Sequence, residues 1–266
     1  MTMNLEAGVS FMEEGGLRLR YQRCGDGEPL VLITGLGGDL RFWRSAMVRL
    51  SECFSVIAFD NRGAGETSYP PGCFSVGDMA DDVAALLRHL GVESAHIMGW
   101  SMGGNIAQEF ALRHPEMVRT LILASTYMRR PSRSSFAIGH IIEAGRALGS
   151  EAVMSMMNAF CMSEDYYRKR EGLVNGNGRQ VYDIEGMALQ KRALDDYDIN
   201  GRIGGIIATT LIIHGEDDIM VPIRFGEEMK SCIPGSKMVR VPGAGHILKS
   251  EDYADHLTEF IGHHSE

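Results

Sequence analysis

The residues Ile97-Met98-Gly99-Trp100-Ser101-Met102-Gly103-Gly104 are the most informative stretch of this 266-residue chain. Gly99, Ser101 and Gly103 match the pattern G-x-S-x-G, in which a serine sits on a sharp turn between a strand and a helix. The turn needs glycine on both sides because it crowds its neighbours against the strand and the helix. Since the pattern is short, a glycine-rich turn that contains a serine by chance is the alternative interpretation.

The sequence around this pattern has the periodicity that such a turn requires. Residues 94–98 form a short apolar run typical of a buried strand, and residues 105–112 have helical spacing. The helical spacing ends at His114-Pro115, where proline cannot continue a helix. The order strand, turn and helix favours a serine nucleophile over a chance match.

Apolar runs of strand length alternate with amphipathic segments along most of the chain. The expected strands are 9–14, 17–23, 29–34, 54–59, 94–98, 118–125, 210–214 and 236–241, and the expected helices are 41–51, 75–91, 105–112, 222–233 and 252–261. Alternation with short connections predicts an α/β protein with a mostly parallel eight-stranded sheet and helices on both faces.

The segment 127–208 interrupts the alternation because it is helical and rich in methionine. We expect it to form a helical cap inserted in a core of residues 1–126 and 209–266. Such an insertion lies over the carboxyl ends of the strands, where ligands bind in open α/β sheets. Its flexible and aromatic side chains are candidates for an apolar pocket, or else ordinary packing between helices: Met128, Met154, Met156, Met157, Phe160, Met162, Tyr166, Tyr167 and Met187.

Composition excludes several classes of protein. The net charge of −9 disfavours a nucleic-acid partner, and 44% hydrophobic residues are typical of an ordinary globular protein. The five cysteines are scattered without C-x-x-C spacing, which predicts free thiols in a reducing compartment and no metal site. We find neither a signal peptide in residues 1–10 nor a run of about 20 apolar residues that would span a membrane. A cytoplasmic location is therefore expected.

A serine nucleophile needs a histidine base and an acid that orients the base. In this architecture they follow the serine in the order acid, histidine, on loops at the same edge of the sheet. The strand 210–214 leads into Glu216, Asp217 and Asp218, and the last strand leads into a glycine-rich loop that ends at His246. We therefore expect His246 to be the base and one of the two aspartates to be the acid.

The chain resembles the α/β-hydrolase family over nearly its whole length. Members commonly carry H-G-x-x-D-x-x-V-P after a late strand, which matches His214, Gly215, Asp218, Val221 and Pro222. This resemblance implies that Asp218, rather than Asp217, is the acid of a catalytic triad. The family's G-x-G-H near the C-terminus is matched by the loop that ends at His246.

The resemblance also implies an oxyanion hole made by two main-chain N–H groups, those of Met102 and Leu36. Many relatives have H-G-x-G-G in the loop that contains Leu36, but this chain has Thr34 in place of the histidine. The donor is a main-chain group, so the replacement need not remove the hole, although it could change how the loop is held. The turn that contains Asp60 and Arg62 resembles the family's D-x-R-G-x-G, and we expect both side chains to bind backbone.

The motifs 35–43 and 99–104 look most like those of bacterial esterases and lactonases of the 3-oxoadipate enol-lactonase type. The resemblance implies a serine hydrolase that cleaves a small carboxylic ester or lactone through an acyl-enzyme, with no cofactor. Carbon–carbon bond hydrolases and cofactor-free haloperoxidases use the same triad. A hydrolase-fold receptor with slow turnover is the alternative outside the enzymes.

Substrate contacts are expected from Trp100 and Phe42 beside the nucleophile, and from Met157 and Phe160 in the cap. The basic residues Arg129, Arg130 and Arg133 could attract an acidic substrate, or form an ordinary solvated surface. The sequence predicts a small-molecule substrate and leaves a homodimer open.

Overall fold

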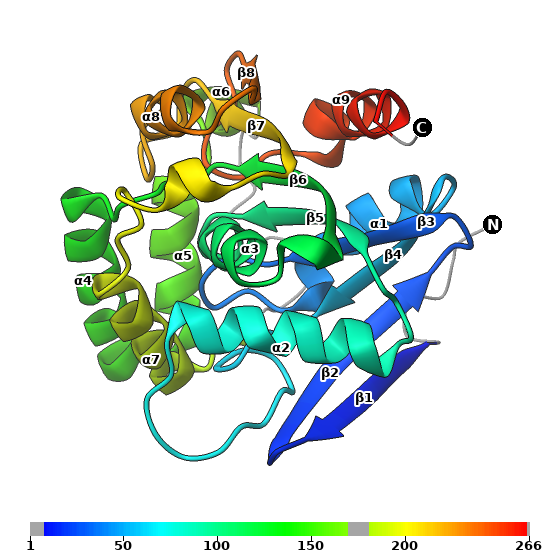
Figure 1. The fold of residues 1–266 in the computed structure, drawn as a ribbon. Coiled ribbons are helices and arrows are strands. Elements are labelled where there is room, and N and C mark those ends of the chain that lie inside the picture. The colour runs from blue at the N-terminus through cyan, green and yellow to red at the C-terminus, as the bar shows by residue number, and fades with distance from the viewer. Residues whose placement is uncertain (1–7, 170–180, 265–266) are drawn as a thin grey trace.

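A computed structural model describes residues 8–169 and 181–264 of the chain. Its sheet has eight strands in the order β1-β2-β4-β3-β5-β6-β7-β8 (Figure 1). β1 pairs antiparallel with β2, and β2 antiparallel with β4, whereas the other neighbours are parallel. The strands are β1 (Val9–Glu14), β2 (Leu17–Cys24), β3 (Glu28–Ile33), β4 (Phe54–Phe59), β5 (Ala95–Trp100), β6 (Val118–Ala124), β7 (Thr209–Gly215) and β8 (Lys237–Val241). The mostly parallel sheet expected from the alternating sequence is confirmed.

Helices cover both faces of the sheet. α1 (Arg44–Leu50) and α9 (Ser250–Gly262) contribute to one hydrophobic cluster, and α2 (Val76–His89), α3 (Met102–Arg113) and α8 (Arg224–Cys232) contribute to the other. Figure 1 shows α2 and α3 in front of the strands and α1 behind them. Successive residues of a strand point to opposite faces, so Leu30 of β3 packs with the α1/α9 cluster and Val31 with the other. Burial on both sides explains why the inner strands are apolar throughout.

A second group of helices comes between β6 and β7 in the sequence, although these two strands are neighbours in the sheet. It comprises α4 (Ser132–Leu148), α5 (Ser150–Cys161), α6 (Glu164–Lys169) and α7 (Ile184–Asp195). Figure 1 shows α4, α5 and α7 beside the ends to which the arrows of β5 and β6 point. The segment begins and ends at the same place, because Ile199 N–H donates to the Met128 carbonyl and Arg129 forms a β-bridge with Asp198. The predicted cap, 127–208, includes residues 170–180, which lie outside the described part of the chain.

One predicted helix differs from the expectation in form. The segment 41–51 begins with a 3₁₀ turn, Leu40–Trp43, and continues as the α-helix α1. Asp39 stands before this turn with extended backbone, and its carboxylate accepts a hydrogen bond from the Arg41 N–H at 2.9 Å. Because a side chain two residues back satisfies this donor, the chain turns tightly before the helix opens to its normal pitch.

Two further expectations concern the cysteines and membrane-spanning helices. All five cysteines are free thiols in the structure, as their scattered positions predict. Within residues 8–169 and 181–264, none of the helices combines the length and the apolar character needed to cross a membrane.

Candidate active site

Ser101 occupies a strained turn between β5 and α3. Its φ of 55° and ψ of −120° are values that few residues with a side chain adopt, and such a conformation costs on the order of 1–3 kcal/mol. The flanking glycines are sterically required: a Cβ on Gly99 would lie 2.1 Å from the Gly103 carbonyl oxygen, and one on Gly103 would lie 2.0 Å from that of Ile33. The turn therefore holds the serine at the carboxyl end of β5.

The structure brings Ser101, His246 and Asp218 together from three loops. His246 Nε2 lies 2.9 Å from Ser101 Oγ, and His246 Nδ1 lies 2.8 Å from Asp218 Oδ2. Asp217 is exposed and contacts this region only through its N–H, which donates to the Ala244 carbonyl. Of the two adjacent aspartates, Asp218 is the one with its carboxylate on the histidine. This is the geometry that nucleophile, base and orienting acid require.

The Asp218 carboxylate is fully buried, with a side-chain exposure of 0%. Burial raises its pKa, but the charges and hydrogen bonds of His246 and His214 together lower it by more. The pKa of Asp218 therefore lies below the ordinary value of an aspartate. Its other oxygen, Oδ1, accepts a hydrogen bond from the Val221 N–H at 2.7 Å. The carboxylate is therefore ionised and fixed in position.

His214 holds the loop that carries Asp218. Its imidazole is completely buried, and Nε2 donates to the Val221 carbonyl at 2.8 Å while lying 3.4 Å from Asp218 Oδ2. The His214–Val221 hydrogen bond therefore joins the two ends of the loop that carries Asp218. These contacts give His214 a structural role in the loop.

Trp100 supports His246 from the strand side. Its indole Nε1 donates to the His246 carbonyl at 2.9 Å, and its ring stacks on Phe42 with a centroid distance of 4.4 Å. The Trp100 and His246 rings are also in contact, with centroids 5.1 Å apart. Trp100 therefore fixes the base and, because it also borders the cavity described below, contributes to the pocket wall.

Two main-chain N–H groups are available to stabilise an oxyanion, those of Leu36 and Met102. Met102 is the first residue of α3, so its N–H has no carbonyl one turn earlier in the helix. Within the described residues, no hydrogen bond is formed by the Leu36 N–H or the Met102 N–H. Both donors are thus unpaired in the described part of the chain.

The loop that contains Leu36 is held from outside itself. The Thr34 carbonyl accepts a hydrogen bond from Asn61 Nδ2 at 2.9 Å, and the Gly37 N–H donates to Gln190 Oε1 at 2.8 Å. The Thr34 hydroxyl, at the position of the usual histidine, is buried without a hydrogen-bond partner in the described structure. Side chains from two other parts of the chain therefore hold this loop.

The Asp60 side chain binds backbone as expected, but the Arg62 side chain does not. Asp60 is buried and accepts hydrogen bonds from the Leu40 N–H at 2.7 Å and the Glu66 N–H at 2.8 Å. Burial raises its pKa above the ordinary value. The Arg62 side chain pairs with Asp82, with Nη2 2.7 Å from Oδ1, instead of binding backbone. A carboxylate on the neighbouring helix α2 satisfies it better than a neutral carbonyl would.

A cavity of about 180 Å³ adjoins the Leu36 loop and the Trp100 ring. Met157 and Phe42, both expected to contact substrate, line it together with Asn158 and Tyr182, which the sequence analysis did not single out. The full lining is Leu36, Gly38, Phe42, Trp100, Met154, Met157, Asn158, Cys161, Met162, Tyr166, Tyr182 and Ile247. Most of these side chains are apolar.

Several of the expected cap contacts lie elsewhere. Phe160 is not part of this lining, although it lies three residues after Met157 on α5 and both side chains pack against the hydrophobic core. Met128 and Met187 are buried in the core, and Tyr167 is exposed. They serve packing or the surface rather than the cavity wall.

The three arginines are also away from the cavity. Arg129 pairs with Glu228 and Arg130 with Asp195, whereas Arg133 is exposed on α4. Their partners and positions explain them without a substrate.

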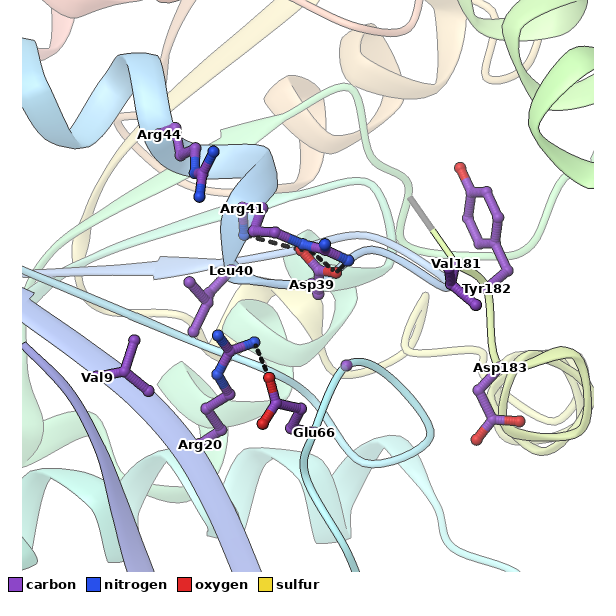
Figure 2. A pocket seen from close by; sticks show the side chains of 11 residues that line it. Val9, Arg20, Asp39, Leu40, Arg41, Arg44, Glu66, Val181, Tyr182 and Asp183 are labelled. Atoms are coloured by element: carbon purple, nitrogen blue, oxygen red, sulfur yellow. Dashed lines mark hydrogen bonds and ion pairs between the residues drawn. The ribbon is translucent and has the colours of Figure 1, made fainter. Parts of the chain in front are cut away.

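A larger cavity of about 590 Å³ lies on the other side of Tyr182 (Figure 2). Four of its charged side chains form two pairs: Arg41 binds Asp39, with Nε 2.9 Å from Oδ2, and Arg20 binds Glu66, with Nη1 3.1 Å from Oε1. None of Ser101, Asp218 and His246 is in the lining of either cavity, but the smaller cavity includes Leu36 and Trp100 and the larger one does not. In the described part of the chain, there is no cluster of three or more His, Cys, Asp or Glu side chains that could hold a metal ion.

Comparison with known proteins agrees with this geometry. A family model described as "alpha/beta hydrolase fold" matches residues 28–253, so the chain belongs to the alpha/beta hydrolase family. A Pantoea ananatis protein with the name "Putative carbamate hydrolase RutD" is 28% identical over 239 residues, which are 87% of this chain and 86% of that protein.

Two solved structures have the same fold. A thermophilic esterase from Thermogutta terrifontis has a TM-score of 0.82 and 26% sequence identity, with 96% of each chain covered. The enol-lactonase from Burkholderia xenovorans LB400 has a TM-score of 0.84 and 24% identity, and covers 95% of this chain and 100% of that chain. The protein is therefore a hydrolase of this family.

Proposed function

We propose that the protein is a serine hydrolase that cleaves a small carboxylic ester or lactone through an acyl-enzyme. The observation that carries this proposal is the continuous pair of hydrogen bonds from Ser101 Oγ to His246 Nε2 and from His246 Nδ1 to Asp218 Oδ2. The ionised carboxylate keeps the Nδ1–H tautomer, so that Nε2 faces the serine hydroxyl as an acceptor. A purely binding protein would not need this arrangement next to two free oxyanion donors.

In the proposed reaction, His246 Nε2 takes the proton from Ser101 Oγ as the oxygen attacks the substrate carbonyl carbon. The Leu36 and Met102 N–H groups bind the oxyanion of the tetrahedral intermediate. His246 then gives its proton to the leaving alkoxide oxygen and the ester bond breaks. A water molecule, deprotonated by His246, attacks the acyl-enzyme and releases the acid. With a lactone, the alcohol and the acid leave as one molecule.

The cavity supports a small substrate. Its volume of about 180 Å³ is below the range of roughly 300–1,000 Å³ that is typical of pockets for drug-sized ligands. Methionines form much of its wall, and their flexible side chains adapt to different acyl groups at low cost. We infer that segment 127–208 acts as a cap, with Met157 as a substrate contact and without Phe160.

Carbamate cleavage is a second candidate, because relatives across most of the chain carry the name of a carbamate hydrolase. The chemistry is the same acyl transfer, but the carbamate nitrogen donates electrons to the carbonyl carbon and makes attack slower. Asn158, Tyr166 and Tyr182 supply polar groups in a mostly apolar lining, which a carbamate nitrogen could use. Parallel kcat/KM values for an ester and a carbamate with the same leaving group discriminate between the two substrates.

The test of the proposal uses the purified full-length chain and its Ser101→Ala variant. A fluorophosphonate probe should label the wild type and not the variant, and p-nitrophenyl acetate should be hydrolysed only by the wild type. Labelling without turnover on a panel of short esters, lactones and carbamates would favour a slow receptor. Halide-dependent oxidation of an indicator dye in the presence of acetate and hydrogen peroxide would favour a haloperoxidase. Cleavage of a β-diketone with no ester turnover would favour a carbon–carbon bond hydrolase.

A further inference from the structure

Helix α7, outside the strand-helix core, contacts the loop that carries one of the two oxyanion donors. Gln190 of this helix is completely buried, and its amide binds main chain on both sides. Its Oε1 accepts a hydrogen bond from the Gly37 N–H at 2.8 Å, and its Nε2 donates to the Arg62 carbonyl at 2.6 Å. One side chain thus joins the Gly35–Gly38 loop to the Asp60–Gly65 turn.

The packing around Gln190 leaves little room for the helix to shift. A Cβ on Gly186 would lie 2.3 Å from the Gly63 carbonyl oxygen, so the first turn of α7 touches the backbone of the Asp60–Gly65 turn. A Cβ on Gly37 would lie 2.8 Å from Met187 Cγ and 2.9 Å from Tyr182 Cδ1. The first turn of α7 is therefore in backbone contact with the Asp60–Gly65 turn, and the Gly35–Gly38 loop packs against the side chains of Met187 and Tyr182.

The loop has few restraints of its own. Within it, the Gly38 N–H donates to the Gly35 carbonyl at 3.1 Å. Thr34, which replaces the usual histidine, has a buried hydroxyl with no hydrogen-bond partner among the described residues. Asn61 binds the Thr34 carbonyl just before the loop, and within the loop the Gly37 N–H donates to the side-chain amide of a residue 153 positions away. Because the glycines impose little conformational preference, the loop depends on this contact.

We propose that Gln190 is a positioning residue of the oxyanion hole. The Leu36 N–H belongs to the Gly35–Leu36 peptide unit, and the next unit along the chain is Leu36–Gly37. Because the Gln190 amide fixes the Leu36–Gly37 unit through the Gly37 N–H, it limits how the Gly35–Leu36 unit and its N–H can rotate. The helical segment then contributes to the chemical step as well as to the shape of the pocket. This inference rests on the proposed function, since it matters for the rate only if an oxyanion forms beside Ser101.

The alternative role of Gln190 is to anchor the helix without affecting the chemistry. A displaced oxyanion donor lowers kcat and weakens the binding of a tetrahedral adduct, while leaving ground-state binding nearly intact. A lost anchor lowers the stability and leaves the activity of the folded molecules unchanged. The two roles are therefore separated by a kcat-against-KM split and by the affinity for a boronic acid, which forms a tetrahedral adduct with the serine.

The experiment compares Gln190→Met, which keeps the length of the side chain but removes both hydrogen bonds, with Gln190→Asn, which keeps the amide but is too short to reach both partners. Leu194→Ala is the matched control, because Leu194 is a buried residue of α7 that does not hydrogen-bond the loop. For each protein we would measure kcat and KM for p-nitrophenyl acetate, the inhibition constant of phenylboronic acid, and the urea midpoint.

We expect both Gln190 variants to lose roughly 10²-fold in kcat, with KM changed by less than about threefold. The affinity for phenylboronic acid should fall by a similar factor. Leu194→Ala should have a lower urea midpoint and a kcat near that of the wild type. If one Gln190 variant fails to fold, the other carries the comparison.

Either of two results would overturn the positioning role: Gln190 variants with wild-type kcat and boronate affinity, or an equal loss of kcat in Leu194→Ala. Ser101→Ala in the same assay separates this failure from that of the proposed function. Retained turnover in Ser101→Ala rejects the serine mechanism itself. Loss of turnover there, with unaffected Gln190 variants, rejects only the role of Gln190.

Discussion

The loops at the carboxyl edge of the sheet and the helices α4–α7 beside them are organised in different ways. In the loops, short motifs determine each catalytic position: glycines that only just fit hold Ser101, and Asp218 and His246 follow the last two strands. In the helices, no motif marks the important residues, and neighbours such as Met157 and Phe160 on α5 have different surroundings. We propose that the loops supply the chemistry and that the helices select the substrate.

Gln190 crosses this division, because it lies on a helix but holds a catalytic loop. The comparison therefore makes distinct predictions. Substitutions in the loops should change kcat for every substrate, whereas those in the cavity wall should change which substrate is preferred.

The largest effect is expected at the nucleophile. Ser101→Ala should lower kcat by about 10³-fold or more for all esters, because only binding and the oxyanion hole remain. Its free energy of unfolding should be equal or higher, since the strained turn is maintained for function. Steady-state kinetics and urea unfolding check the two parts. Turnover near the wild-type rate would refute the assignment of the loops to the chemistry.

Next in size is the difference between the two adjacent acids. Asp218→Asn should lower kcat by roughly 10²–10³-fold, because an amide cannot stabilise the imidazolium and favours the wrong tautomer of His246. Asp217→Asn is the matched control, since that side chain is exposed, and should change kcat by less than about twofold. The measurement is kcat for p-nitrophenyl acetate at neutral pH. A larger loss at Asp217 would be incompatible with the observed hydrogen bonds.

A smaller effect is expected in the cavity wall. Met157→Ala enlarges the cavity, so the ratio of kcat/KM for p-nitrophenyl hexanoate to that for the acetate should rise by roughly tenfold. Phe160→Ala, on the same helix but outside the lining, should leave this ratio unchanged while lowering the stability. Kinetics over a series of chain lengths test this. The same change of ratio in both variants would show that the cavity is not the acyl site.

The smallest effect concerns stability in acid. The pKa of Asp218 is lower in the folded protein than in an ordinary aspartate, so the ionised carboxylate contributes stability that is fully present above about pH 4. This contribution is lost as the pH falls through the folded pKa. The difference in unfolding free energy between the wild type and Asp218→Asn should therefore be constant above pH 4 and shrink below it.

Urea unfolding at several pH values measures this difference, with Asp217→Asn as the control for net charge. A difference that is constant down to pH 2.5 would contradict the lowered pKa.

Much of this molecule was predictable from patterns. The strand β4 was expected at 54–59 and found at Phe54–Phe59, because a fully buried strand is an uninterrupted apolar run. Ser101 was named from its G-x-S-x-G motif and His246 from its loop after the last strand, whereas Asp218 was preferred to Asp217 only because of the resemblance to the family's loop motif. The 3₁₀ turn before α1 was missed, since it depends on the Asp39 side chain rather than on hydrophobic spacing.

The helical segment was harder to predict. Its methionines suggested a pocket, but Met187 on α7 packs on the Gly37 loop while Met157 on α5 lines the cavity. Helical spacing does not show which buried methionines face the cavity. Asn158 and Gln190 carry no motif. The only signal for Gln190 was indirect: Thr34 in place of a histidine raised the question of what holds the loop.

The sequence by itself determined the fold, and it named a candidate nucleophile and the order of its candidate partners. These depend on local periodicity and on tight turns that tolerate few residue types. Only the tertiary structure decided which side chains form the 180 Å³ cavity and that Gln190 holds the Gly37 loop. Such contacts arise where helices pack against loops from distant parts of the chain, and their geometry depends on how whole surfaces interlock.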